Sequence, residues 1–421
     1  MPQAPSNPRP RPVHALAAGL AALTTLIFSP APANAEAIEE QATEPKRFLM
    51  HYMPWYEAPD TRGRWGEHWT GWQKQHNPDQ LNDKGHPDIW SNMNPLIGPY
   101  DSSDPDVLEC QLLQMKVAGI DGVIADWYGI ANTADYPSIH TATKALFEAC
   151  EELGMSFSIC YEDRTVQYMV ERDELAADEI ADHLTETFRW VEDNWFRSDT
   201  YERYNSRPLL LNFGPIFIKD ADPWHTALNA LDERPAFFPL HHLWKGVNAD
   251  GGFTWVHAEA INDAKSDADA VEALTRVFRY PADDPKQVII SALPGFDDVY
   301  ANSFTSVPYN EGRTLRNHLE AAKRSDSPIL QLVTWNDYGE ATCIEPTHEF
   351  GYLFLEIIQE HRAEEFGSSF RFTKDDLRLP ARLLELRRAG KAPEARLDRI
   401  AELIAAGETR MARTMLNALE R

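Results

Sequence analysis

The 421-residue sequence has few cysteines and, after its first 35 residues, no long apolar run. The four cysteines are Cys110, Cys150, Cys160 and Cys343. No two of them have CxxC spacing, so a disulfide scaffold and a cysteine-based zinc or redox centre are not expected. Each lies in an apolar stretch, which predicts buried free thiols, although an exported chain could form one disulfide. No apolar run approaches the roughly 20 residues of a membrane-spanning helix.

Positive charge is also scarce. Lys and Arg number 40 against 66 Asp and Glu, and the formal net charge is -26. Such a chain repels phosphate backbones and anionic lipid, so neither nucleic acid nor a membrane surface is an expected partner. An acidic polysaccharide would need a local basic cleft, and a neutral small or polymeric ligand fits better.

Several motifs of common enzyme classes are missing. No GxGxxG follows a predicted strand, which argues against a dinucleotide-binding fold, and no GxSxG elbow supports a serine nucleophile. The neighbours His241 and His242 and the later His257 fall on different predicted strands, and neither HxH nor HExxH spacing occurs. We therefore expect no metal site and no cofactor.

The first 35 residues have the three parts of a secretory signal peptide. Arg9 and Arg11 form a basic region, Ala15–Phe28 is an apolar region of 14 residues, and Ala33-Asn34-Ala35 is a small-x-small cleavage site. The apolar region is too short for a comfortable membrane span. The sequence thus predicts an exported protein, periplasmic or extracellular, that begins at Glu36 with a formal charge of -28, because only two arginines are removed.

The rest of the chain alternates short apolar runs with amphipathic stretches, the pattern of parallel βαβ units. Helices are expected over 106–118, 139–153 and 177–195. The expected strands are Phe48–Tyr52, Gly122–Trp127, Phe157–Tyr161, Leu209–Phe213, Ala236–Leu240, Phe253–Val256, Val288–Ala292 and Ile329–Thr334. Eight strands with intervening helices in about 310 residues favour a closed (β/α)₈ TIM barrel over an open sheet. We expect a catalytic domain over 36–372, with a long loop over 56–104 after the first strand, and a small C-terminal helical extension over 373–421.

Aromatic and polar residues gather where the predicted strands end, which is the functional face of such a barrel. Trp and Tyr planes cover the apolar faces of sugar rings, and carboxylates and amides bind the hydroxyls. This combination predicts a carbohydrate partner. The candidate substrate-binding residues are Tyr52, Trp55, Asp126, Trp127, Tyr161, Asp163, Trp335 and Asn336.

Asp337 and Glu340 follow the last predicted strand and are the candidate catalytic pair. Cleavage of a glycosidic bond needs one group that protonates the leaving oxygen and a second that activates water, acts as a nucleophile or activates a substrate hydroxyl. Two carboxylates held close together acquire different pKa values, which keeps one of them protonated as the acid.

The stretch Thr334–Glu345 (TWNDYGEATCIE) resembles the WNDYGES catalytic motif of glycoside hydrolase family 71, the α-1,3-glucanases, and the WNEWHEG…IEP motif of family 99, the endo-acting α-mannosidases and mannanases. His51–Tyr56 (HYMPWY) resembles the YYPWY start of family 99, and Pro99–Ser102 and Asp126–Gly129 look like its YSS and SWWG elements. The whole chain looks most like secreted bacterial proteins of a family 71/99-like type.

The resemblance implies that Glu340 is the general acid and Asp337 its partner. In family 99 the partner deprotonates the substrate 2-hydroxyl and the configuration is retained, whereas in family 71 it activates water with inversion. The sequence thus predicts a glycosidase that cleaves a neutral, α-linked glycan. Two alternatives stay open: a carbohydrate-binding barrel that does not cleave its ligand, and a metal-dependent hydrolase.

Overall fold

The computed structural model describes residues 45–279, 284, 287–300 and 306–421. The chain divides into Met1–Thr43 and Glu44–Arg421, and only the second unit is described below. The predicted signal peptide lies outside the described residues. In the described ranges, none of the helices combines the length and the apolar composition that crossing a bilayer requires.

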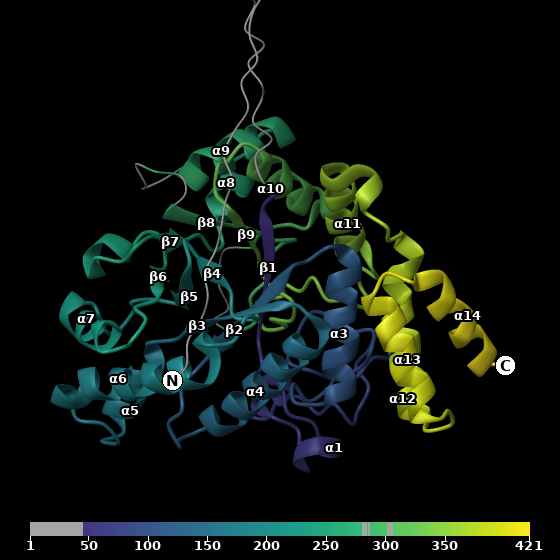
Figure 1. Cartoon of the computed structure of the whole chain (residues 1–421), viewed down its shortest axis with the longest axis horizontal. Helices are drawn as coiled ribbons and strands as arrows, with labels where there is room; N and C mark the ends of the chain where they lie inside the picture. Colours follow the sequence, from purple (N-terminus) through teal and green to yellow (C-terminus); the bar gives the residue numbers. More distant parts are fainter. Residues whose placement is uncertain (1–44, 280–283, 285–286, 301–305) are drawn as a thin grey trace, which may run out of the picture. The chain divides into compact units, whose positions relative to one another are not determined.

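Eight parallel strands form the sheet at the centre of this unit (Figure 1). They are β1 (Arg47–Tyr52), β2 (Gly122–Trp127), β3 (Ser156–Tyr161), β5 (Arg207–Asn212), β6 (Ala236–Pro239), β7 (Gly252–Phe253), β8 (Val288–Ala292) and β9 (Ile329–Leu332). β1 pairs with both β2 and β9, and a parallel bridge between Leu240 and Phe253 joins β6 to β7. All eight predicted strands are confirmed, and the curled sheet has the predicted TIM-barrel-like fold. A two-residue strand, β4 (Arg203–Tyr204), pairs antiparallel with β5.

Helices follow most of the strands. They are α1 (Pro59–Arg62), α2 (Glu67–Thr70), α3 (Pro105–Ala118), α4 (Tyr136–Leu153), α5 (Arg164–Glu171), α6 (Ile180–Val191), α7 (Ala221–Asn229), α8 (Ala258–Asn262), α9 (Asp267–Arg279), α10 (Arg313–Lys323) and α11 (Leu353–Phe366). Short 3-10 or π turns cover Ala177–Glu179, Glu192–Phe196, Trp244–Val247, Asn310–Gly312, Gly367–Ser369 and Lys374–Arg378. α3 shows why the predicted boundaries hold: Asp104 caps its first turn, and Gly119 ends it in the left-handed region, with φ 86°.

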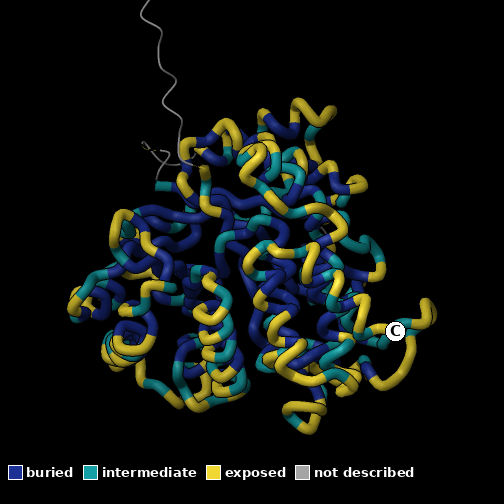
Figure 2. The backbone as a smooth tube through the Cα atoms, turned by 45° about the vertical axis from the view of Figure 1, so that its right-hand side comes forward, coloured by how far each residue is buried: buried dark blue, intermediate teal, exposed yellow. Residues whose placement is uncertain are grey.

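The strands separate two apolar cores, because successive side chains on a strand point to opposite faces. Phe48 and Met50 of β1 pack in the core that the strands share with the helices. Leu49 of β1 and Ile124 of β2 point to the barrel interior, where they join a second core. Figure 2 shows buried backbone at the centre and exposed residues mostly on the outer helices and loops.

The C-terminal extension consists of α12 (Leu379–Ala389), α13 (Glu394–Ala405) and α14 (Thr409–Leu419). α12 and α13 contact α3, beside which they are drawn in yellow in Figure 1. Leu383, Leu397 and Ile400 belong to the same core as the outer faces of the strands. The extension is thus packed on the barrel as part of the described unit.

Candidate active site

A cavity of about 970 Å³ opens where the carboxyl ends of the strands meet. Asp126 ends β2, Glu162 follows β3, and the loop after β9 carries Asp337 and Glu340, all in the cavity wall. The other acidic lining residues are Glu57, Glu67, Asp135 and Asp298. The aromatic ones are Trp55, Trp65, Trp72, Tyr128, Tyr136, Tyr168, Phe213, Trp255 and Tyr300. Carboxylates at the centre and aromatic rings around them give a site that can hold a sugar and act on it.

The loop that carries Asp337 and Glu340 is fixed by short contacts. Thr334 Oγ1 accepts a hydrogen bond from Asp337 N at 2.8 Å, and Asp337 Oδ1 accepts one from Glu340 N at 2.9 Å. Asn336 clips the loop to the end of β1: its Oδ1 accepts from Met53 N at 2.8 Å and its Nδ2 donates to Met53 O at 3.0 Å. The backbone of the loop and the Asp337 carboxylate are therefore fixed in place.

A buried carboxylate behind the loop supports it. Glu345 is buried and accepts hydrogen bonds from Tyr100 Oη at 2.9 Å, Gln111 Nε2 at 2.7 Å and Tyr338 Oη at 2.6 Å. Tyr338 directly follows Asp337, so Glu345 ties the loop after β9 to α3 and to the long loop after β1.

Burial dominates the electrostatics of the carboxylates. It raises the pKa of Asp337 to about 7, and the negative charge of Asp298 adds to this rise, while backbone N–H groups of Glu340 and Gly339 oppose it. Burial also raises the pKa of Glu162 to about 7, and Arg164 opposes that rise. For Glu340, burial and then the charges of Asp337, Asp298 and Glu162 raise the pKa well above its usual range.

The four carboxylates Asp126, Glu162, Asp337 and Glu340 therefore cannot all be ionised near neutral pH. Burial, followed by the charges of the other three, also raises the pKa of Asp126. The pair thus has the asymmetry that acid catalysis needs, because burial and then the charge of ionised Asp337 raise the pKa of Glu340. Glu340 Oε2 has no hydrogen-bond partner among the described residues, which leaves it free for a substrate oxygen.

Stacked rings form the outer walls. Trp55 and His68 stack at 4.4 Å with an interplanar angle of 9°. Across the loop, Trp72 stacks on Tyr300 at 5.6 Å, although 58% of its surface is exposed. A large exposed indole at a cavity mouth is a ready platform for a sugar ring.

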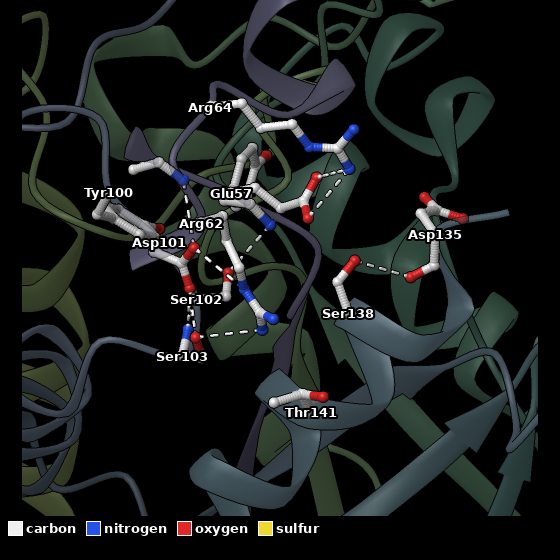
Figure 3. A network of polar contacts seen from close by, with 12 residues as sticks. Glu57, Arg62, Arg64, Tyr100, Asp101, Ser102, Ser103, Asp135, Ser138 and Thr141 are labelled. Atoms are coloured by element: carbon white, nitrogen blue, oxygen red, sulfur yellow. Dashed lines mark hydrogen bonds and ion pairs between the residues drawn. The ribbon is translucent and has the colours of Figure 1, made fainter. Parts of the chain in front are cut away.

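Ion pairs hold the long loop after β1 in place. Arg64 Nη2 lies 3.1 Å from Glu57 Oε2, and both residues line the cavity. Arg62 reaches Ser103 Oγ at 3.3 Å and lies 3.6 Å from Asp101 Oδ2. Figure 3 shows these side chains converging from the two ends of the loop. The loop is thus an ordered part of the cavity wall.

Of the ten predicted site residues, the cavity brings together Trp55, Asp126, Asp337 and Glu340. The structure corrects the placement of three aromatic residues, Tyr52, Trp127 and Tyr161. They end β1, β2 and β3 but point outward into the helix-facing core, because they alternate with the inward-facing residues. Tyr52 Oη, for example, donates to Gln111 Oε1 at 2.7 Å, away from the cavity.

The placement of Asp163, Trp335 and Asn336 is corrected as well, since none of them lines the cavity. Asp163 accepts hydrogen bonds from Ile216 N, Phe217 N and Ile218 N at 2.8–2.9 Å. Trp335 is fully buried in the helix-facing core, and Asn336 is the clip to β1 described above. All three side chains are instead engaged in contacts within the protein.

The cavity also contains residues that sequence reasoning missed as site residues. Glu162 was available from the sequence, because it has the same parity along β3 as Cys160, an inward-facing residue. Trp255 follows by the same alternation, because it lies two residues after Phe253, an inward-facing residue of β7. Tyr300 and Trp72 lie in loops whose folding no local pattern specifies.

The chain is similar to known proteins both in sequence and in structure. Residues 45–353 match the family model described as glycosyl hydrolase family 99. The mouse glycoprotein endo-alpha-1,2-mannosidase is 31% identical over 112 residues, which are 23% of this chain and 23% of the mouse protein. A human glycoprotein endo-alpha-1,2-mannosidase-like protein is 31% identical over 96 residues, 21% of each chain. The chain thus spans about a quarter of the length of these curated relatives.

Solved structures agree in fold. The GH99 endo-alpha-mannosidase from Bacteroides thetaiotaomicron superimposes with a TM-score of 0.57 at 17% identity, over 76% of this chain and 97% of that chain. A glycoside hydrolase-like protein superimposes with a TM-score of 0.54 at 13% identity, over 80% of this chain and 97% of that one.

Proposed function

Since the chain belongs to glycosyl hydrolase family 99, we propose that it hydrolyses α-mannosidic bonds within a glycan, with Asp337 and Glu340 as the two catalytic carboxylates. The pair on its fixed loop at the cavity is the observation that carries this proposal. The names of the mouse and human relatives support an endo-acting α-mannosidase. The predicted likeness to family 99 is confirmed by the family match, and the likeness to family 71 stays a resemblance.

In the proposed reaction, protonated Glu340 donates its proton to the glycosidic oxygen, and the bond from that oxygen to the anomeric carbon breaks. The raised pKa of Glu340 keeps this proton available at neutral pH. Ionised Asp337 removes the proton of the substrate 2-hydroxyl, whose oxygen closes on the anomeric carbon. Water then opens this three-membered ring and the protons return, so that the product keeps its configuration. Asp337 has one methylene fewer than the glutamate at this position of the family 99 motif WNEWHEG. Its carboxylate must therefore lie closer to the sugar.

The test compares Glu340→Gln with Asp337→Asn. We expect Glu340→Gln to lose about 10²–10⁴ in turnover on α-mannan oligosaccharides, because it keeps size but cannot donate the proton. The loss is smaller on an aryl α-mannoside with a nitrophenol leaving group, which needs little protonation. Asp337→Asn loses activity on both kinds of substrate, because its task is not at the leaving group.

A matched control is Glu186→Gln, an exposed glutamate on α6, which leaves turnover unchanged. Proton NMR of the first product decides the stereochemistry: retention supports the 2-hydroxyl route, and inversion indicates an activated water. If both cavity variants keep near wild-type turnover on every α-mannan, the assignment is wrong. Asp126 and Glu162 then become the next carboxylates to test, since Asp163 is engaged elsewhere.

A further inference from the structure

Three potential metal ligands face one another inside the barrel. His51 lies on β1, Asp126 on β2 and Cys160 on β3, and all three side chains are buried. Asp126 and Cys160 are direct partners in the β2–β3 register. One ligand atom from each residue lies within 4.8 Å of the other two. This is the one group of three His, Cys, Asp or Glu residues at such distances in the part of the chain that the structure describes.

Three polar atoms of this group lack hydrogen-bond partners among the described residues. His51 Nδ1 contacts Gln331 Oε1 at 3.3 Å, but His51 Nε2 is buried without a partner among the described residues. The same holds for both carboxylate oxygens of Asp126. Leaving buried polar groups unsatisfied destabilises a fold, so three such atoms together call for an explanation.

We propose that His51 Nε2, Asp126 and Cys160 Sγ form a binding site for a thiophilic divalent cation such as Zn²⁺. Zinc takes imidazole nitrogen, carboxylate oxygen and thiolate sulfur at about 2.0–2.3 Å in a tetrahedral arrangement. Ligand atoms in such a site are about 3.3–3.8 Å apart, so the observed separations need only a small contraction. The fourth position would belong to water.

The charges and hydrogen bonds also fit. A thiolate and a carboxylate together balance the formal charge of a dication, which suits a buried site. The thiol proton, and that of Asp126 where it is held, leave to water through the cavity, which His51 and Asp126 both line. Gln331 Oε1 accepts from Nδ1–H of the His51 ring and thereby turns the lone pair of Nε2 toward Asp126 and Cys160, the usual outer-shell arrangement for a metal-ligating histidine.

The sequence could not indicate this site by spacing, because each ligand comes from a different strand. It is also separate from His241, His242 and His257, which do not form a group of three at ligand distance in the described ranges. The inference does not depend on the proposed function, because metal binding is measured without any substrate.

The experiment titrates the metal-free full chain with Co²⁺ as a spectroscopic probe and then with Zn²⁺ in competition. We expect about one equivalent of Co²⁺ to bind, with a sulfur-to-cobalt charge-transfer band in the near ultraviolet that Zn²⁺ abolishes. Cys160→Ala loses the band. Cys150→Ala, which removes another buried thiol on α4, keeps it and is the matched control.

Two further variants test the geometry where folding of Cys160→Ala is impaired. His51→Gln removes the nitrogen ligand and leaves the thiol. Gln331→Met removes the hydrogen bond to the His51 ring, together with the one from Gln331 Nε2 to Ser291 Oγ, and should weaken binding about 10- to 100-fold. Wild-type protein that gives no charge-transfer band with excess Co²⁺ would overturn the proposal. So would a folded Cys160→Ala variant that keeps the band, or a His51→Gln variant with wild-type affinity.

Discussion

Asp126 and Trp127 are neighbours in the sequence but face opposite sides of the sheet, and this alternation explains three of the six predicted site residues that lie outside the cavity. The motif and the end of the last strand sufficed to predict Asp337 and Glu340 at the cavity. The clusters of aromatic and polar residues at the other strand ends did not suffice to predict the cavity lining, because only every second residue of a strand points into the barrel. Counting alternate residues along β2 from Asp126 rejects Trp127, and counting along β3 from inward-facing Cys160 selects Glu162.

Asp163 has a structural role that a mutation can expose. It accepts three backbone hydrogen bonds from the segment after β5, and an asparagine at this position would offer one acceptor oxygen and an opposing NH₂ group. We expect Asp163→Asn to lower the free energy of unfolding by about 1.5–3 kcal/mol in urea titrations, with KM unchanged. Asp178→Asn, at an exposed position, is the control and should change neither quantity. An increase in KM with unchanged stability would restore the substrate-binding role.

The pH profile follows from the raised pKa values. Asp337 must be ionised, and its pKa of about 7 places the acidic limb there: turnover rises as pH increases through about 7. Turnover falls again at higher pH, where Glu340 loses its proton. The two limbs belong to the coupled group and are measured as kcat against pH.

A variant tests this assignment. Glu162 raises the pKa of Glu340 by its charge, so Glu162→Gln should move the basic limb of kcat to lower pH. Glu186→Gln leaves the profile in place. A basic limb that moves to higher pH in Glu162→Gln would contradict the assignment of Glu340 as the acid.

At the scale of elements, the strands and main helices could be predicted because their apolar runs and caps are local signals. Gly119 and Gly154 end α3 and α4 where the sequence places them. The sequence predicts that a long loop follows β1, but it does not predict the conformation of this loop, because the contacts that fix it are long-range. Trp69, for instance, donates from its indole to Tyr100 O at 2.8 Å, 31 residues away. The same holds for Tyr300, whose place against Trp72 depends on two separate loops.

The C-terminal helices are expected to contribute to stability through α3. Arg387 of α12 is 5% exposed and donates to both oxygens of Glu109 on α3, at 2.9 and 2.8 Å. Arg387→Ala should lower the free energy of unfolding by about 1–3 kcal/mol, because it leaves Glu109 half-buried without its partner. Arg399→Ala breaks an exposed pair with Glu402 within α13 and should cost no more than about 1 kcal/mol. Equal effects in urea titrations would mean that this contact does not join the two helices energetically.

At the scale of the whole molecule, the negative charge of the chain and the acidic cavity both favour a neutral ligand over an anionic one. The formal charge of -26 gives a surface that repels anionic polymers, while the cavity concentrates carboxylates whose burial, followed by their mutual repulsion, raises their pKa values. We expect a neutral mannan, which neither field attracts, to bind through aromatic faces and hydroxyl contacts. The proposed substrate class therefore agrees with the charge of the chain as well as with the pair at its centre.

Export is the remaining prediction at this scale, and it rests on residues 1–35. We expect the chain, expressed in full in a secreting host, to appear outside the cytoplasm and to begin at Glu36, because Ala33 and Ala35 occupy the two small-residue positions of the cleavage site. Intact mass measurement of the exported protein gives the start directly. Ala35→Phe should block cleavage, because a bulky residue does not fit there, whereas Ala31→Phe lies outside the two positions and should leave the start unchanged. Exported protein that still carries Met1, or a chain that stays in the cytoplasm uncut, would contradict the prediction. The first strand begins at Arg47, so cleavage before Glu36 leaves every described element of the barrel intact.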